Sequence, residues 1–413
     1  MKLETPPIFY ITKDPERATG IEDILENYHI ICPYKSPLTR QLKESGVRVF
    51  VIEEEYPQNL EKALRAGTYG MLQLECVKKY LNEESKGETP RILILKNSKL
   101  MELWCEKQGW KLFAPKANTA TAYENKISQY NKLKDFVPFP KTIIAKLENA
   151  QSLLENAKFP LVMQFNSGHS GEGTIILNDP SQLESYKQKF PDREVRIASF
   201  IKGKTYTLNA LAAKNGNIYT GSISLQLTGL PEATNNPSST VGNDFQKPRE
   251  DLTEEQTASI ASIAQIVGMT MRKEGYVGLF GIDVIAEEKT GNVCLIEVNT
   301  HQPASVSFEA RLHRAIGKIP LFLIWVRDMM EQDGYMPQEE LLSPILLPFP
   351  AYQILYRNKE NREVTAETLN YPGSLNIIPS RMKHIGPNQE LFRIQIYEQP
   401  ITNGHSHGGH ESH

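Results

Sequence analysis

The sequence predicts a parallel α/β fold at the N-terminus, a two-lobed α+β fold after it, and a small β-rich appendage at the end. Strand-like and helix-like segments alternate over the first 115 or so residues, as in a parallel sheet covered by helices. Short strands joined by hairpin turns then follow, and short β-rich runs fill the last part of the chain. These changes of pattern predict domains at residues 1–115, 116–203, 204–335 and 336–402, with a disordered His-rich tail at 403–413.

The first domain contains four strand-like runs, PIFYIT, VRVFVIEE, RILILK and WKLFAP, with helical patterns between them. No GxGxxG sequence follows the first run, so the fingerprint of a dinucleotide-binding turn is absent. The sequence of the first domain therefore predicts a parallel α/β fold without this fingerprint.

The second domain is expected to begin with a helix over TAYENKISQYNKLKDF and to continue through strands TIIA, LVMQF, TIIL and EVRIASFI. A glycine-rich loop, SGHSGEGT, separates LVMQF from TIIL. Glycines allow positive φ angles and expose backbone N–H groups to an anion, so this loop is a candidate for binding phosphate. A tight hairpin explains it equally well, because its spacing is GxxGxG and no Walker-type Gly-Lys-Ser/Thr is present.

The third domain is expected to open with a hairpin around Asn215 and Gly216. Residues 228–250 are polar and rich in turn residues, which indicates a lid, a binding loop or disorder. A long amphipathic helix should follow, with Thr253 and Gln256 as a capping box, and residues 308–330 should form a helix or helix pair.

Between these helices, YVGLFGIDVIAEEKTGNVCLIEVNTHQP predicts a β-hairpin whose turn uses Gly291 and Asn292 at positive φ. Folding the hairpin about residue 290 places Asp283 opposite Glu297, with Asn299 on the same face; Ile282, Val284, Ile296 and Val298 then point to the other. Opposed residues lie about 5 Å apart, so the two carboxylates would repel unless a cation joined them. Oxygen ligands suit Mg²⁺. The alternative is a pair of solvated acids on an exposed face.

Composition excludes several function classes. The 46 basic and 49 acidic residues nearly balance, which argues against nucleic acid as the main partner, and no apolar run is long enough for a membrane span. The four cysteines show no CxxC spacing, and the N-terminus lacks the pattern of a secretory signal, so we expect a cytoplasmic protein.

The order of these elements resembles the ATP-grasp superfamily, and GIDVI followed by LIEVNT is the most specific match. The resemblance covers residues 115–330 and implies that ATP lies between the two lobes. It implies that Asp283, Glu297 and Asn299 bind Mg²⁺, with Mn²⁺ as an alternative, and that Lys126 contacts phosphate. It further implies that nucleotide is bound by the backbone of Phe200 and Ile201, by Gln164 and by the glycine-rich loop through Ser167, Gly168, Ser170, Gly171 and Gly173.

Three positions depart from the pattern of this superfamily. Gln164 stands where a phosphate-binding lysine is usual, and Gly281 and His301 stand where members often place an arginine. The resemblance leaves His301 and Arg311 as candidates for the missing catalytic charge, with Lys202 and Lys204 as further substitutes.

The function that the resemblance implies is an ATP-dependent ligase. It would activate a substrate carboxylate as an acylphosphate and couple it to an amine, such as an amino acid or a peptide, with release of ADP and phosphate. A homodimer is also common in the superfamily. Two alternatives stay open: a nucleotide-binding regulator that has lost turnover, which the missing charges favour, and an enzyme of the biotin-carboxylase or purine-pathway type.

Overall fold

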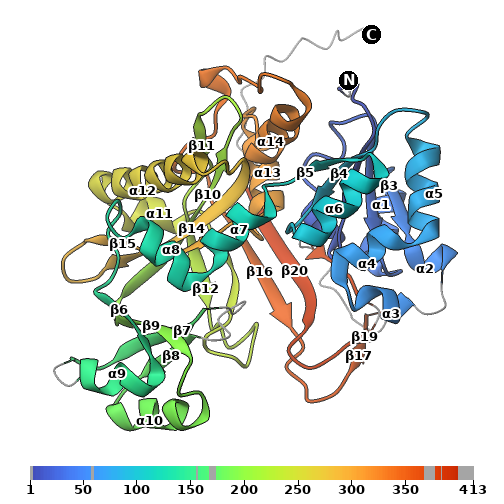
Figure 1. The fold of residues 1–413 in the computed structure, drawn as a ribbon. Coiled ribbons are helices and arrows are strands. Elements are labelled where there is room, and N and C mark those ends of the chain that lie inside the picture. The colour runs from blue at the N-terminus through green and yellow to red at the C-terminus, as the bar shows by residue number, and fades with distance from the viewer. Residues whose placement is uncertain are drawn as a thin grey trace, which may run out of the picture.

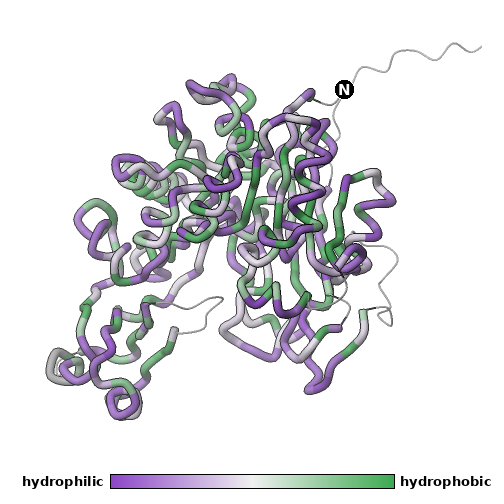
Figure 2. Tube along the Cα trace, turned by 45° about the vertical axis from the view of Figure 1, so that its right-hand side comes forward, coloured by the Kyte–Doolittle hydropathy of each residue, from purple (hydrophilic) through white to green (hydrophobic). Residues whose placement is uncertain are grey.

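The computed structural model shows three sheets of four or more strands, arranged as three regions of one molecule (Figure 1). A hydropathy-coloured trace shows apolar segments gathered within each region and polar segments on the outer turns (Figure 2). Among the described residues, the helices are too short or too polar to span a lipid bilayer. The structure describes residues 3–56, 60–154, 157–166, 174–366, 377–382 and 384–398.

The N-terminal region is a five-stranded parallel sheet in the order β3-β2-β1-β4-β5. This confirms the predicted α/β fold, although β2, with the sequence YHIIC, was not among the predicted strands. Apolar residues on both faces of β1 are buried, as expected for a strand covered by helices on each side. The elements are β1 (Ile8–Ile11), η1 (Pro15–Ala18), β2 (Tyr28–Cys32), α1 (Pro37–Glu44), β3 (Arg48–Val51), α2 (Ile52–Glu55), α3 (Leu60–Leu64), α4 (Gly67–Gln73), α5 (Glu75–Glu84), β4 (Arg91–Ile94), α6 (Lys99–Gln108) and β5 (Lys111–Phe113).

Two helices connect this region to the next: α7 (Ala117–Glu124) and α8 (Lys126–Leu133). The sequence predicted a single helix here. Asn125 interrupts it, because its extended backbone ends α7 and its side chain accepts a hydrogen bond from Ser128 N, which starts α8. Both helices contribute buried residues to the core of the large lobe.

The small lobe is a four-stranded antiparallel sheet in the order β6-β9-β7-β8. Its core is formed by alternate residues of the strands together with apolar residues of the two helices, while the opposite face of the sheet carries Gln164 and Arg196. The elements are β6 (Thr142–Lys146), α9 (Leu147–Leu153), β7 (Leu161–Phe165), β8 (Thr174–Leu177), α10 (Pro180–Lys189) and β9 (Glu194–Ser199).

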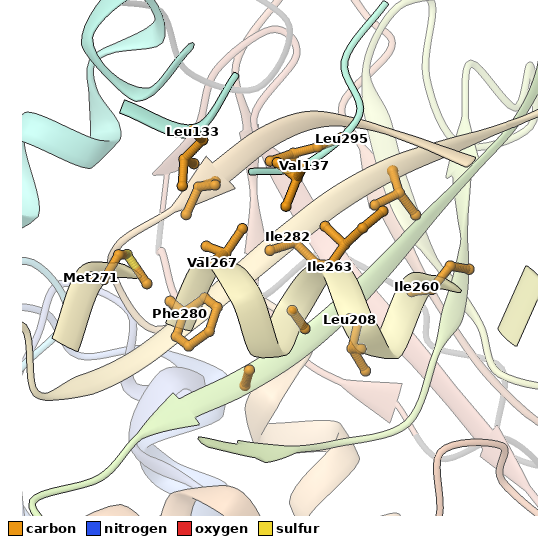
Figure 3. Packing of buried hydrophobic residues seen from close by; sticks show 14 of the residues in the cluster. Leu133, Val137, Leu208, Ile260, Ile263, Val267, Met271, Phe280, Ile282 and Leu295 are labelled. Carbon is orange, nitrogen blue, oxygen red and sulfur yellow. The ribbon is translucent and has the colours of Figure 1, made fainter. Parts of the chain in front are cut away.

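The large lobe is built on a nine-stranded sheet in the order β15-β14-β10-β12-β13-β16-β20-β18, with β11 paired to β10. Helix α12 packs its apolar stripe on this sheet, and side chains such as Ile263 and Val267 face Phe280 and Ile282 (Figure 3). The capping box of Thr253 and Gln256 is confirmed. The elements are β10 (Gly203–Ala212), β11 (Ile218–Thr220), β12 (Ser224–Thr228), β13 (Thr240–Asp244), α11 (Lys247–Asp251), α12 (Glu254–Lys273), β14 (Gly278–Glu287), β15 (Val293–Asn299), α13 (Val306–Ala315), α14 (Leu321–Met330) and η2 (Glu339–Leu341).

Part of the segment 228–250 is regular structure, because β13 lies within it and α11 begins within it. The C-terminal strands β16 and β20 pair in antiparallel fashion and join the large sheet through β13, so the predicted β-rich appendage extends the sheet of the large lobe (Figure 1). The His-rich tail lies outside the described residues. The last elements are β16 (Ala351–Arg357), β17 (Val364–Thr365), β18 (Ile377–Ile378), β19 (His384–Ile385) and β20 (Glu390–Tyr397).

Candidate functional site

The acidic hairpin forms as predicted, with Asp283 on β14 directly opposite Glu297 on β15. Asn299 lies on the same face and donates a hydrogen bond to Asp283 Oδ2 at 3.2 Å. The turn uses Gly291 at φ +72°, whereas Asn292 does not have the positive φ that was expected.

One detail of the predicted alternation is wrong. The register shifts between Asp283 and Val284, which pairs Val284 with Leu295 and leaves Ile296 as an extra residue. Leu295 therefore takes the core position that was expected for Ile296, and Ile296 is only partly buried. A bulge of this kind bends a strand and redirects its side chains, so it sets the direction of Glu297.

Asp283 is held by neutral hydrogen-bond donors. Thr207 Oγ1 and Gln226 Nε2 lie 2.8 and 2.7 Å from Asp283 Oδ1. Burial and the nearby charge of Glu297 raise the pKa of Asp283 from 3.8 to about 6. When Asp283 is ionised, it repels the carboxylate of Glu297, and a bound cation would remove this repulsion.

Lys126 supplies a positive charge on the other side of the acid pair. It is the first residue of α8, is only 4% exposed, and its Nζ lies 2.5 Å from Glu297 Oε2. The end of β7 meets the start of this helix, because Asn166 Oδ1 accepts a hydrogen bond from Ile127 N at 3.2 Å. The structure thus brings Lys126 to the acids, although 171 residues separate it from Glu297.

Gln164 lies at the end of β7 and is 6% exposed. Its Nε2 donates to Thr174 Oγ1 at 3.2 Å, so the side chain sits at the base of the predicted phosphate loop. The loop residues proposed to bind nucleotide, Ser167, Gly168, Ser170, Gly171 and Gly173, lie outside the described residues.

Two buried residues that sequence reasoning missed contact the backbone on either side of Glu297. Arg196 Nη1 donates to the carbonyl oxygen of Ile296 at 3.0 Å, and Gln129 Oε1 accepts from Val298 N at 2.8 Å. Because β15 is the edge strand of the sheet, these side chains satisfy groups that no further strand covers. The one available signal was an arginine at an alternating position within the apolar run EVRIAS.

Phe200 and Ile201 form the connection between β9 of the small lobe and β10 of the large lobe, as expected. Gly203 begins β10 in close contact with β14, since a Cβ atom there would lie 2.0 Å from the carbonyl oxygen of Ala286. The two lobes are therefore joined next to the acidic hairpin.

His301 follows the acidic strand and its Nδ1 lies 3.2 Å from both carboxylate oxygens of Glu124. Glu124 also accepts a hydrogen bond from Thr300 N and lies 3.1 Å from Lys96. Burial alone would raise the pKa of Glu124, but His301, Lys96 and Thr300 hold it well below its usual range. His301 is thus anchored to α7 beside the site.

The remaining candidate cations have other partners. Arg311 donates to Gln395 Oε1 at 2.6 Å and to Thr19 Oγ1, which places its guanidinium at the junction of α13 with β20 and the N-terminal region. Lys204 pairs with Asp251 at 2.7 Å. On β10 it lies on the face opposite to that of Thr207, which contacts Asp283. Lys202 pairs with Glu288 at the tip of the hairpin.

Comparison with protein-family models gives a match to the ATP-grasp domain over residues 123–304. Residues 123–304 form an ATP-grasp domain. This segment contains Lys126, β7 to β9, the lobe connection and the acidic hairpin, so the match covers the residues that the structure brings together. A search of curated protein sequences gives no significant match.

Solved structures of ATP-grasp enzymes share the fold along nearly the whole chain. N5-carboxyaminoimidazole ribonucleotide synthetase from Thermotoga maritima is 14% identical, with a TM-score of 0.59, and the match covers 96% of this chain and 95% of that one. A biotin carboxylase–β,γ-ATP complex from Campylobacter jejuni is 13% identical (TM-score 0.66; 95% and 87% covered). The biotin carboxylase domain of 2-oxoglutarate carboxylase from Hydrogenobacter thermophilus, with MgADP, ADP and bicarbonate, is 14% identical (TM-score 0.64; 95% and 86% covered).

The donor set of the ATP-grasp domain suits a divalent cation that prefers oxygen. Asp283, Glu297 and Asn299 offer two carboxylates and an amide on one face of the hairpin. Within the described residues, no group of three or more His, Cys, Asp and Glu side chains is arranged to hold a metal by itself. An ion here would therefore need further ligands, as Mg²⁺ does when nucleotide phosphates and water complete its shell.

Proposed function

We propose that this protein is an ATP- and Mg²⁺-dependent ligase, which activates a substrate carboxylate and couples it to an amine. One observation carries the proposal: two opposed acids, one with a raised pKa and the other paired to a buried lysine, lie beside the connection between two ATP-grasp lobes. The N5-carboxyaminoimidazole ribonucleotide synthetase and biotin carboxylases that share the fold support the same class of chemistry.

Asp283, Glu297 and Asn299 are the residues that would hold Mg²⁺ and orient the phosphates. When bound, the ion would draw charge from the phosphoryl group during its transfer. Glu297 would exchange its contact with Lys126 for the metal. The Nζ of Lys126, released from this pair, would then be free to donate to a phosphate.

The proposed reaction has two steps. An oxygen of the substrate carboxylate attacks the γ-phosphorus, and the bond from that phosphorus to the bridging oxygen of ADP breaks. The amine nitrogen then attacks the acyl carbon, phosphate leaves with the electron pair of the C–O bond, and the amine loses a proton. Phe200 and Ile201 would bind the adenine through their backbone, while His301 and Arg311 stay candidates for charge near the acyl carbon.

The test measures ADP and phosphate release from ATP and Mg²⁺ with a panel of carboxylates, bicarbonate included, and amines. Glu297→Gln should lower turnover by about 10²–10³-fold, because it removes one preorganised charge. Glu288→Gln is the matched control, since Glu288 lies at the tip of the same hairpin and pairs with Lys202 on the surface. Equal turnover in Glu297→Gln and wild type would contradict this site.

A second candidate function is nucleotide binding without turnover. Gln164 favours it, because a neutral amide stands where the superfamily usually has a lysine. Tight MgADP binding with no product from any carboxylate and amine pair would support this function over the ligase.

A further inference from the structure

The bulge in β15 leaves Ile296 without a partner on β14, one residue before Glu297. The guanidinium of Arg196 meets the carbonyl oxygen of Ile296 at 3.0 Å. Because a carbonyl oxygen without a hydrogen-bond partner is costly even where it is partly buried, this bond favours the bulged conformation. The direction of Glu297 therefore depends on a side chain from the other lobe.

Arg196 is itself held rigidly. Its backbone pairs with Ile144 of β6 and Gln164 of β7 in the middle of the small-lobe sheet. Its guanidinium carbon lies 5.2 and 5.6 Å from the ring centroids of Phe139 and Tyr130, and the residue is 1% exposed. A planar guanidinium can lie with its face against an aromatic ring and donate hydrogen bonds from its edge at the same time.

Burying the charge of Arg196 lowers the stability of the fold. Burial lowers the pKa of Arg196 to about 10, while Glu297 and Tyr130 act in the opposite direction, so the group stays charged at neutral pH. Within the described part of the chain its Nε has no hydrogen-bond partner. An apolar side chain of similar length would avoid the cost of burying the charge, but it would leave the carbonyl oxygen of Ile296 without this donor. The hydrogen bond to β15 is therefore what the buried charge provides.

We propose that Arg196 is a positioning residue, which fixes Glu297 through the Ile296 carbonyl and thereby sets the affinity of the acid pair for metal-bound nucleotide. This inference rests on the proposed function. In this proposal, a side chain of the small lobe positions the strand of the large lobe that carries Glu297, a proposed metal ligand. Loss of Arg196 should then affect nucleotide binding only when the metal is present.

The experiment compares ADP affinity in excess Mg²⁺ and in EDTA by isothermal titration calorimetry. Arg196→Met should weaken binding about 10–100-fold in Mg²⁺, the usual effect of removing a residue that orients a metal ligand, and change it only slightly in EDTA. The matched control is Arg193→Met, because Arg193 also stacks on two rings of the small lobe, Phe165 and Phe190, but is exposed and belongs to the turn before β9. Arg193→Met should behave like wild type.

The inference would be overturned by an equal loss in Mg²⁺ and EDTA, by no loss in either, or by full recovery of the Mg²⁺ effect when Gln164→Lys is added to Arg196→Met. The last would mean that any nearby charge suffices. If Arg196→Met does not fold, Arg196→Lys decides by the same comparison, with an intermediate loss expected. If Mg²⁺ does not raise the ADP affinity of the wild type, the proposed function fails and the inference fails with it. If Mg²⁺ raises the ADP affinity of Arg196→Met as much as that of the wild type, only the inference is refuted.

Discussion

Replacing Asp283 by asparagine should stabilise the metal-free protein at neutral pH, although it removes a proposed ligand. Burial and the charge of Glu297 raise the pKa of Asp283 from 3.8 to about 6, so the folded protein disfavours the ionised carboxylate. A shift of about two pKa units corresponds to about 3 kcal/mol of lost stability once the group is fully ionised. Asparagine has no charge and escapes this loss.

The net gain should be smaller. Asparagine can still accept hydrogen bonds from Thr207 and Gln226 through its oxygen, but its amide nitrogen cannot accept the one from Asn299. That lost bond costs about 1 kcal/mol, which leaves a gain of about 2 kcal/mol. Because the folded pKa is raised, wild type loses stability as the pH rises from 3.8 through about 6. The advantage of asparagine is therefore absent near pH 4 and complete above about pH 7.

Urea denaturation in EDTA at pH 4.5, 6 and 7.5 measures this difference. Asp251→Asn is the control, since Asp251 pairs with Lys204 at 2.7 Å and gains nothing from losing its charge. Excess Mg²⁺ with ADP should reverse the order, because only wild type keeps both carboxylates. The reasoning would be refuted if Asp283→Asn were less stable than wild type in EDTA at pH 7.5, or if its advantage did not change with pH.

Two further predictions concern the framework of the site. Gly203→Ala should lower the free energy of unfolding by about 1–3 kcal/mol, because its Cβ atom would lie 2.0 Å from the carbonyl oxygen of Ala286; an unchanged urea midpoint would contradict the close approach of β10 and β14. Arg393→Met should cost about 3–5 kcal/mol, since the buried Arg393 pairs with Asp14 at 2.9 Å and Glu16 at 2.5 Å; a thermal midpoint like that of wild type would show that the cluster contributes nothing.

The acidic hairpin could be predicted from the sequence because strand alternation and turn chemistry act locally. Gly291 marks the turn, and counting residues from it places Asp283 opposite Glu297. The bulge at Ile296 could not be predicted, since both Leu295 and Ile296 suit a buried position and only the packed core selects one of them. The pairing of β16 with β13 could not be predicted either, because the pairing of strands that are distant in sequence leaves no local signal.

Arg196 and Gln129 were missed for a related reason. Each acts on β15 through a single hydrogen bond across 100 residues or more, and neither belongs to a motif. Sequence reasoning offered His301 and Arg311 for the missing charge; the structure shows His301 in contact with Glu124, and Arg311 with Gln395 and Thr19. A charged residue within an apolar run is a further signal, because burying a charge is costly and demands a partner.

The two cations beside Glu297 differ in what they can do. Lys126 bonds the carboxylate itself, and because its side chain is flexible we expect it to change partners if a cation binds Glu297. Arg196 bonds the backbone and lies against the rings of Tyr130 and Phe139, so we expect it to stay in place when the carboxylate changes partner. A lysine at position 164 would duplicate the mobile charge without fixing the strand. The neutral Gln164 is therefore compatible with a working site, provided that Arg196 holds Glu297 in the direction that the acid pair requires.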